Sequence, residues 1–140
     1  MSAMMIPNSL KKALRSRYED EPNNVHESGT DHEWTITYSF SEWSGYHDET
    51  NYYSYSTTIL DHEPDLSDSQ DWFRVKMLPQ NKEYYAKLFQ GFDIVDLYEI
   101  SKRCGYPEHY SKTVIKLNCP EPDSRCANPL WILTESSKFR

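Results

Sequence analysis

Residues 34–41 read WTITYSFS, so four apolar residues alternate with four hydroxyl-bearing residues. Successive side chains of a β-strand point to opposite faces, and this period of two predicts a half-buried strand. Residues 52–60, YYSYSTTIL, predict a second strand, and the loop that separates the two is centred on Gly45. The length of this loop predicts that the strands pair as an antiparallel hairpin.

Together with the segments on either side of this hairpin, the sequence predicts an α+β fold with a mainly antiparallel sheet. Alternation predicts strands and a 3.6-residue spacing of apolar side chains predicts helices. The expected elements are a basic amphipathic helix at 8–18, strands at 34–41, 52–60 and 72–78, helices at 80–90 and 93–104, and strands at 110–118 and 130–134. The first three strands are expected to form a meander, and Gly91 and Gly105 to end the two later helices.

A chain of 140 residues is the right length for one domain. Residues 19–31, EDEPNNVHESGTD, are polar, contain Pro and Gly, and show no periodicity. We therefore expect residues 1–31 to form a basic helix on an acidic mobile linker, and residues 32–140 to form a single α+β domain.

The charged residues are sorted into blocks along the chain, whose formal net charge is −7. Residues 1–18 contain four basic residues and no acid, whereas residues 19–71 contain 14 Asp or Glu and no Lys or Arg. Residues 72–140 contain 11 basic and 8 acidic residues. This sorting predicts an acidic and a basic territory in the folded protein. It also argues against nucleic-acid binding by the folded body, because the acidic block repels phosphates.

The cellular location follows from what the sequence lacks. It has no secretory signal and no run of about 20 apolar residues that could cross a bilayer. The three cysteines, Cys104, Cys119 and Cys126, are an odd and sparse set, unlike the frameworks of small secreted domains. The sequence predicts an intracellular protein, cytoplasmic or nuclear, that is neither secreted nor transmembrane.

Three similar tripeptides, at residues 31–33, 47–49 and 61–63, each combine His with Asp and Glu. In the predicted hairpin, His32 and His62 lie at the open end, while His47 lies at the turn about 30 Å away at roughly 3.3 Å per residue. His32 and His62 are therefore the candidates for a metal site or for a small carboxylate- or His-dependent enzyme. The alternative is that these tripeptides are solvated polar loops.

Four of the five histidines lie in the acidic block, namely His26, His32, His47 and His62. Neighbouring carboxylates favour the protonated imidazolium. We therefore hypothesise that this region changes its charge between about pH 6 and 7.5 and then holds a basic partner less strongly.

No cofactor and no catalytic residue is predicted. The cysteines form no CxxC pair, and nothing in the spacing supports a Cys nucleophile with His109 as its base. Gly-rich phosphate-binding patterns and the GxSxG motif are also missing from the sequence.

Binding of other macromolecules is the function that these observations favour. Exposed aromatic residues rimmed by acids make a contact patch. The residues expected to meet a basic protein surface, or another copy of the chain, are Trp43, Tyr46, Asp48, Glu49, Tyr52, Asp61, Glu63, Asp65 and Asp68. The helix residues expected to contact a membrane, a neighbouring subunit or RNA are Lys11, Lys12, Arg15 and Arg17, unless this helix is solvated or docks on the acidic block of the same chain.

The predicted function is that of a non-enzymatic interaction or assembly protein, of a small accessory or structural kind. In general terms, this layout is similar to that of viral matrix and other small accessory proteins, although no family motif matches residue by residue.

Overall fold

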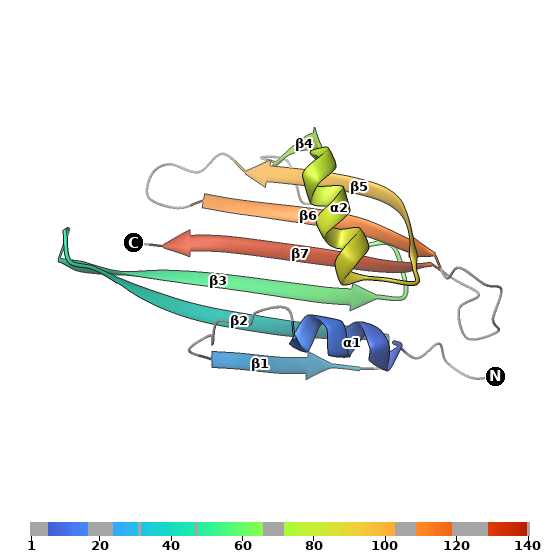
Figure 1. Cartoon of the computed structure of the whole chain (residues 1–140), viewed down its shortest axis with the longest axis horizontal. Coiled ribbons are helices and arrows are strands. Elements are labelled where there is room, and N and C mark those ends of the chain that lie inside the picture. The colour runs from blue at the N-terminus through green and yellow to red at the C-terminus, as the bar shows by residue number, and fades with distance from the viewer. Residues whose placement is uncertain are drawn as a thin grey trace.

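The computed structural model describes residues 6–16, 24–30, 32–46, 48–65, 72–102, 109–118 and 129–139. These residues form two helices, α1 (Asn8–Arg15) and α2 (Pro79–Leu88), and seven strands. The strands are β1 (Asn24–Gly29), β2 (Glu33–Ser44), β3 (Glu49–Leu60), β4 (Trp72–Lys76), β5 (Asp93–Lys102), β6 (His109–Asn118) and β7 (Leu130–Phe139). They build one antiparallel sheet in the order β1-β2-β3-β7-β6-β5-β4 (Figure 1).

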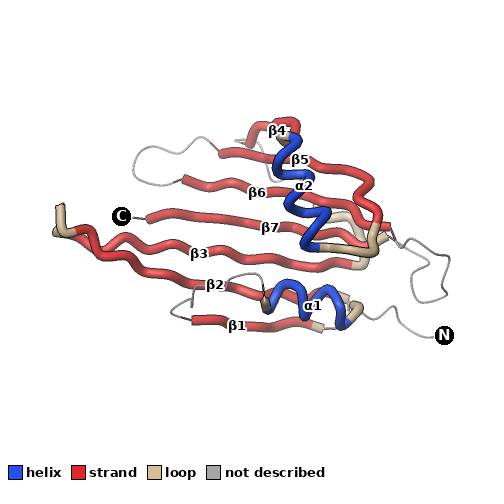
Figure 2. The backbone as a smooth tube through the Cα atoms, viewed as in Figure 1, coloured by secondary structure: helices blue, strands red, loops and turns tan. Residues whose placement is uncertain are grey.

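Both helices lie on the same face of the sheet (Figure 1). Helix α1 crosses β1 and β2, and α2 crosses the strands of the other half, as the tube trace also shows (Figure 2). An antiparallel sheet needs cover on one face only, and its other face can carry polar residues. In β2 and β3 that open face carries Ser and Thr, and Thr35 Oγ1 lies 2.8 Å from Thr58 Oγ1.

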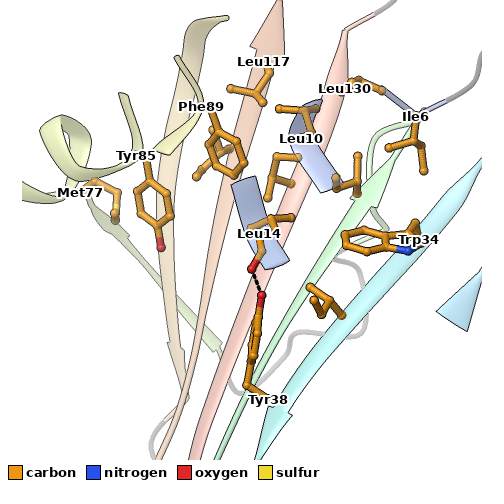
Figure 3. Close-up of a cluster of buried hydrophobic side chains, with 14 residues drawn as sticks. Ile6, Leu10, Leu14, Trp34, Tyr38, Met77, Tyr85, Phe89, Leu117 and Leu130 are labelled. Carbon is orange, nitrogen blue, oxygen red and sulfur yellow. Dashed lines mark hydrogen bonds between the residues drawn. The ribbon is translucent and has the colours of Figure 1, made fainter. Parts of the chain in front are cut away.

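The hydrophobic core lies between this sheet face and the helices. Trp34, Ile36 and Tyr38 of β2 are 6%, 0% and 2% exposed, which confirms the predicted apolar face of this strand. Leu10 and Leu14 of α1 are 1% and 0% exposed and pack into the same cluster (Figure 3). The Tyr38 hydroxyl donates a hydrogen bond to the carbonyl oxygen of Leu14, which ties the helix to the sheet.

The predicted hairpin and the sheet-rich α+β class are confirmed. Strands β2 and β3 pair antiparallel, from Glu33 opposite Leu60 to Ser44 opposite Glu49. The N-terminal helix is present, but it is packed into the core. Part of the predicted mobile linker is a strand, since Asn24–Gly29 form β1 on the edge of β2. All six β1 residues are exposed, so the backbone ladder, and not a buried face, holds this strand.

Two predictions of secondary structure and topology are wrong. The helix expected at 93–104 is the strand β5, whose extra residue, Val95, interrupts the alternation and produced an apparent helical spacing. The expected meander is also wrong, because β4 pairs with β5 at the far edge of the sheet and β3 pairs with β7. Strand order depends on long-range pairing, which local patterns do not encode.

The strand order keeps the charge blocks apart in space. Strands β1, β2 and β3 carry the acidic block and form one half of the sheet, while β4, β5, β6 and β7 come from the basic part of the chain. Arg15 joins α1 to the acidic half through an ion pair with Glu27 at 2.7 Å, and Lys112 pairs with Glu135 at 3.4 Å inside the other half. Each of these ion pairs therefore lies on one side of the boundary between β3 and β7.

Candidate functional site

The hairpin of β2 and β3 extends beyond the rest of the sheet as a two-stranded ribbon. Strand β1 pairs with β2 only as far as Ser39, and β7 pairs with β3 only as far as Tyr52. The ribbon that starts at Ser41 and ends at Tyr52, the last β3 residue paired with β7, is here called the arm (described residues 41–46 and 48–52), and it leaves the sheet at one end of the molecule (Figure 1). Isolated two-stranded ribbons are at best marginally stable in water, so a contact with another surface would add to the stability of the arm.

The arm presents large aromatic side chains to solvent. Trp43 is 62% exposed, Tyr46 is 92% exposed and Tyr52 is 57% exposed. Trp43 lies opposite Thr50 in the ladder, and Tyr52 follows Thr50 by two residues, so Trp43 and Tyr52 are diagonal neighbours on one face. These three residues were predicted to form a contact patch at the hairpin tip, and the structure places all of them on the arm.

The arm is also uniformly acidic. It carries Glu42, Asp48 and Glu49 and contains no Lys or Arg. Asp48 sits at the end of the turn with φ 51°, a left-handed conformation that Asp adopts more readily than most residues. Glu42 accepts a hydrogen bond of 3.1 Å from the hydroxyl of Tyr53 at the base of the arm. The tip therefore combines apolar surface with negative charge.

A different cluster lies at the opposite end of the same ribbon. The Nδ1 atom of His62 lies 2.9 Å from one carboxylate oxygen of Asp61, and the Nδ1 atom of His32 contacts the other. These hydrogen bonds, first from His62 and then from His32, lower the pKa of Asp61 below its ordinary value. The structure therefore brings the two predicted histidines together on one carboxylate. Within the described part of the chain, however, no group of three or more His, Cys, Asp or Glu side chains is arranged to hold a metal ion.

The predicted partner-binding residues consequently fall into two groups. Trp43, Tyr46, Asp48, Glu49 and Tyr52 lie on the arm, whereas Asp61, Glu63 and Asp65 lie beyond the other end of β3. Tyr52 and Asp61 are nine positions apart, which corresponds to about 30 Å of strand. Asp68, like His47 and the three cysteines, lies outside the described residues. At this distance, the two groups of residues need not belong to the same partner-binding surface.

The basic residues of α1 contact the protein itself. Arg15 forms the ion pair with Glu27 and holds the pKa of Glu27 below its usual range. The Lys11 ammonium and the Arg15 guanidinium both lie 5.7 Å from the ring centroid of Trp34. Lys12 is exposed, and Arg17 lies outside the described residues. The structure thus shows the alternative in which this helix docks on the acidic block of its own chain.

A groove of about 620 Å³ lies between the start of α2 and the outer edge of β5. Strand β4 pairs with β5 from Tyr98 to Lys102, so the preceding residues of β5 face the groove instead of a strand. The groove is lined by Lys76, Met77, Lys82, Ile94, Val95 and Tyr98, among others. Sequence reasoning missed this feature because it assigned β5 to a helix, which left no strand edge to expose.

No protein family, no curated protein and no solved structure matches the chain. Among the described helices, α1 and α2 are both too short and too polar to cross a membrane.

Proposed function

We propose that this chain is a non-enzymatic interaction protein that docks through the arm onto a basic, partly apolar protein surface. The observation that carries the proposal is the exposure of Trp43, Tyr46 and Tyr52 on a ribbon that extends beyond the sheet and bears only negative charge. The few residues that dominate the binding energy at protein interfaces are enriched in Trp, Tyr and Arg, and complementary charge steers the partners together.

Several features support docking through this element. Trp43 and Tyr52 stand on paired strands, so their backbone is already held in the ladder and less conformational entropy is lost on binding. Glu42, Asp48 and Glu49 add negative charge to the arm, which disfavours contacts with phosphate-rich surfaces and favours contacts with Lys and Arg. An assembly role, with accessory or structural character, is one form of this function, since the basic half of the sheet offers such a surface on another copy.

Site-specific photo-crosslinking tests the proposal. A photoreactive phenylalanine analogue in place of Tyr46 should give adducts in an extract of the cells that make the protein, and the attached peptides should be rich in Lys or Arg. The variant Glu42→Lys/Glu49→Lys should reduce the adduct yield at least about tenfold, because like charges across an interface are strongly unfavourable.

Two controls keep this result specific to the arm. The same probe at Tyr84, which is 44% exposed on α2, should give few adducts. The variant Glu33→Lys/Glu63→Lys makes an equal charge change at the other end of the ribbon and should leave the yield from position 46 nearly unchanged. Equal yields from positions 46 and 84, or equal losses in both charge variants, would contradict docking through the arm.

The shared carboxylate of Asp61 favours one second candidate, a metal-dependent or His-dependent site at His32 and His62. Both Nδ1 atoms face Asp61, so this site would act through the two Nε2 atoms. Calorimetric titration with Zn²⁺ tests it. Binding that disappears in His32→Ala and His62→Ala but persists in His26→Ala would favour this function, and no heat of binding would exclude the metal-dependent form.

A further inference from the structure

We propose that the groove beside β5 receives the arm of a second copy of this chain. This inference rests on the proposed function of the arm and names its partner. The occupant is inferred from the shape of the groove, from its charge and from the positions of arm and groove in the fold.

The shape of the groove suits an extended segment with a bulky side chain. Its walls are mostly apolar, and Val95 and Tyr98 on its rim are 47% and 39% exposed. A cavity of roughly 150 Å³ accommodates a benzene ring, so a groove of about 620 Å³ has room for an indole or a phenol with its flanking backbone. The outer edge of β5 also presents backbone groups with which an added strand can pair.

The charge of the groove complements that of the arm. Lys76 and Lys82 line the groove with one carboxylate, Asp96, whereas the arm carries three carboxylates and no cation. If the arm bound another acidic surface, or the groove another basic surface, like charges would lie close together, which costs several kcal/mol. Arm against groove is the pairing that avoids this cost.

The two surfaces lie too far apart to meet within one molecule. The arm leaves one end of the sheet, while the first half of β5, which lines the groove, lies toward the opposite end of the strands (Figure 1). The contact therefore joins two copies, and it uses a different surface on each. Such heterologous contacts leave one arm and one groove unused in every dimer, so they continue into a ring or an open array.

A charge-swap experiment followed by sedimentation velocity tests this pairing. At low salt the wild type should sediment as concentration-dependent oligomers that dissociate at high salt. The groove variant Lys76→Glu/Lys82→Glu and the arm variant Glu42→Lys/Glu49→Lys should each remain monomeric. Their mixture should assemble again, because the acidic arm of the first fits the basic groove of the second and the basic arm of the second fits the acidic groove of the first.

The control variant Lys12→Glu/Lys87→Glu changes the same number of exposed charges away from the groove and should assemble like the wild type. Circular dichroism and thermal unfolding show that each variant is folded before it is compared. A wild type that stays monomeric at every salt concentration, a mixture that fails to assemble, or a control that dissociates equally would overturn the proposal. If crosslinks from position 46 persist on another protein in these cases, the arm still docks and only its partner was wrongly assigned.

Discussion

Single side chains decide how α1 is held to the sheet. The hydroxyl of Tyr38 reaches the carbonyl of Leu14 in a buried position, where a lost hydrogen bond is not replaced by water. The ring of Trp34 meanwhile lies under Lys11 and Arg15. These contacts explain why the short helix, which was expected to lie on a mobile linker, belongs to the folded body.

Replacing Tyr38 by Phe should lower the free energy of unfolding by about 1–2 kcal/mol, since it removes the donor and leaves the Leu14 carbonyl buried without it. Urea unfolding followed by circular dichroism measures this change. Tyr52→Phe, at a position that is 57% exposed, is the matched control and should change stability by less than about 0.5 kcal/mol. A Tyr38→Phe protein as stable as the control would contradict the hydrogen bond.

The carboxylate of Asp61 predicts a pH effect with a definite sign. Its pKa is lower in the folded protein than in the unfolded chain, so it stabilises the fold above the unfolded pKa. That contribution disappears as the pH falls through the lowered folded pKa. The wild type should therefore lose more stability than Asp61→Asn as the pH falls from about 5 to below 3. Urea unfolding at several pH values tests this, with Glu63→Gln as control, and equal losses in wild type and Asp61→Asn would exclude the effect.

At the level of elements, alternation identified β2 and β3, because the apolar residues within 34–40 and 53–59 fall on one face. Alternation failed for β5 because this strand has apolar residues on both faces. Leu97 packs on the face that the helices cover, and Ile100 is buried on the opposite face. The bulge at Val95 also shifts the alternation of its side chains by one residue. It also missed β1, whose six exposed residues carry no apolar signal. The arm residues could be predicted from their place at the hairpin tip, whereas the groove required knowledge of which strand edge is left open.

Helix α1 gives a direct test of whether the N-terminal segment is part of the domain. Leu14 is 0% exposed, so Leu14→Ala should destabilise the whole protein by about 2–5 kcal/mol through lost burial and a cavity. The exposed neighbour substitution Lys12→Ala should have little effect. A cooperative transition at the wild-type urea midpoint for Leu14→Ala would show that α1 is not part of the folding unit.

The turn between β1 and β2 depends on a glycine. Gly29 has φ 133°, and a Cβ atom there would lie 2.1 Å from the backbone oxygen of Glu33. Gly29→Ala should therefore cost at least about 2 kcal/mol, because the backbone must shift from a conformation that other residues rarely adopt. Gly45→Ala is the control, since its Cβ would meet only Trp43 Nε1 at 3.8 Å. Thermal unfolding that shows equal stability for the two variants would contradict this account of the turn.

At the scale of the whole molecule, folding preserves the sorting of charge that the sequence shows. The strand order places the acidic block in one half of the sheet and the basic part of the chain in the other, and the arm and the groove lie on opposite halves. A molecule with two separated and complementary surfaces is suited to directional contacts, and the geometry of a head-to-tail contact follows from that separation.

Amide hydrogen exchange with peptide-level mass spectrometry measures the engagement of the arm most directly. In dilute protein at high salt, the amides of residues 41–52 should exchange quickly, since the ribbon stands alone there. In concentrated protein at low salt, residues 41–52 and 93–98 should become protected together, while α1 stays unchanged. Fast exchange of the arm under every condition, or protection confined to other segments, would contradict the claim that the arm is the docking element.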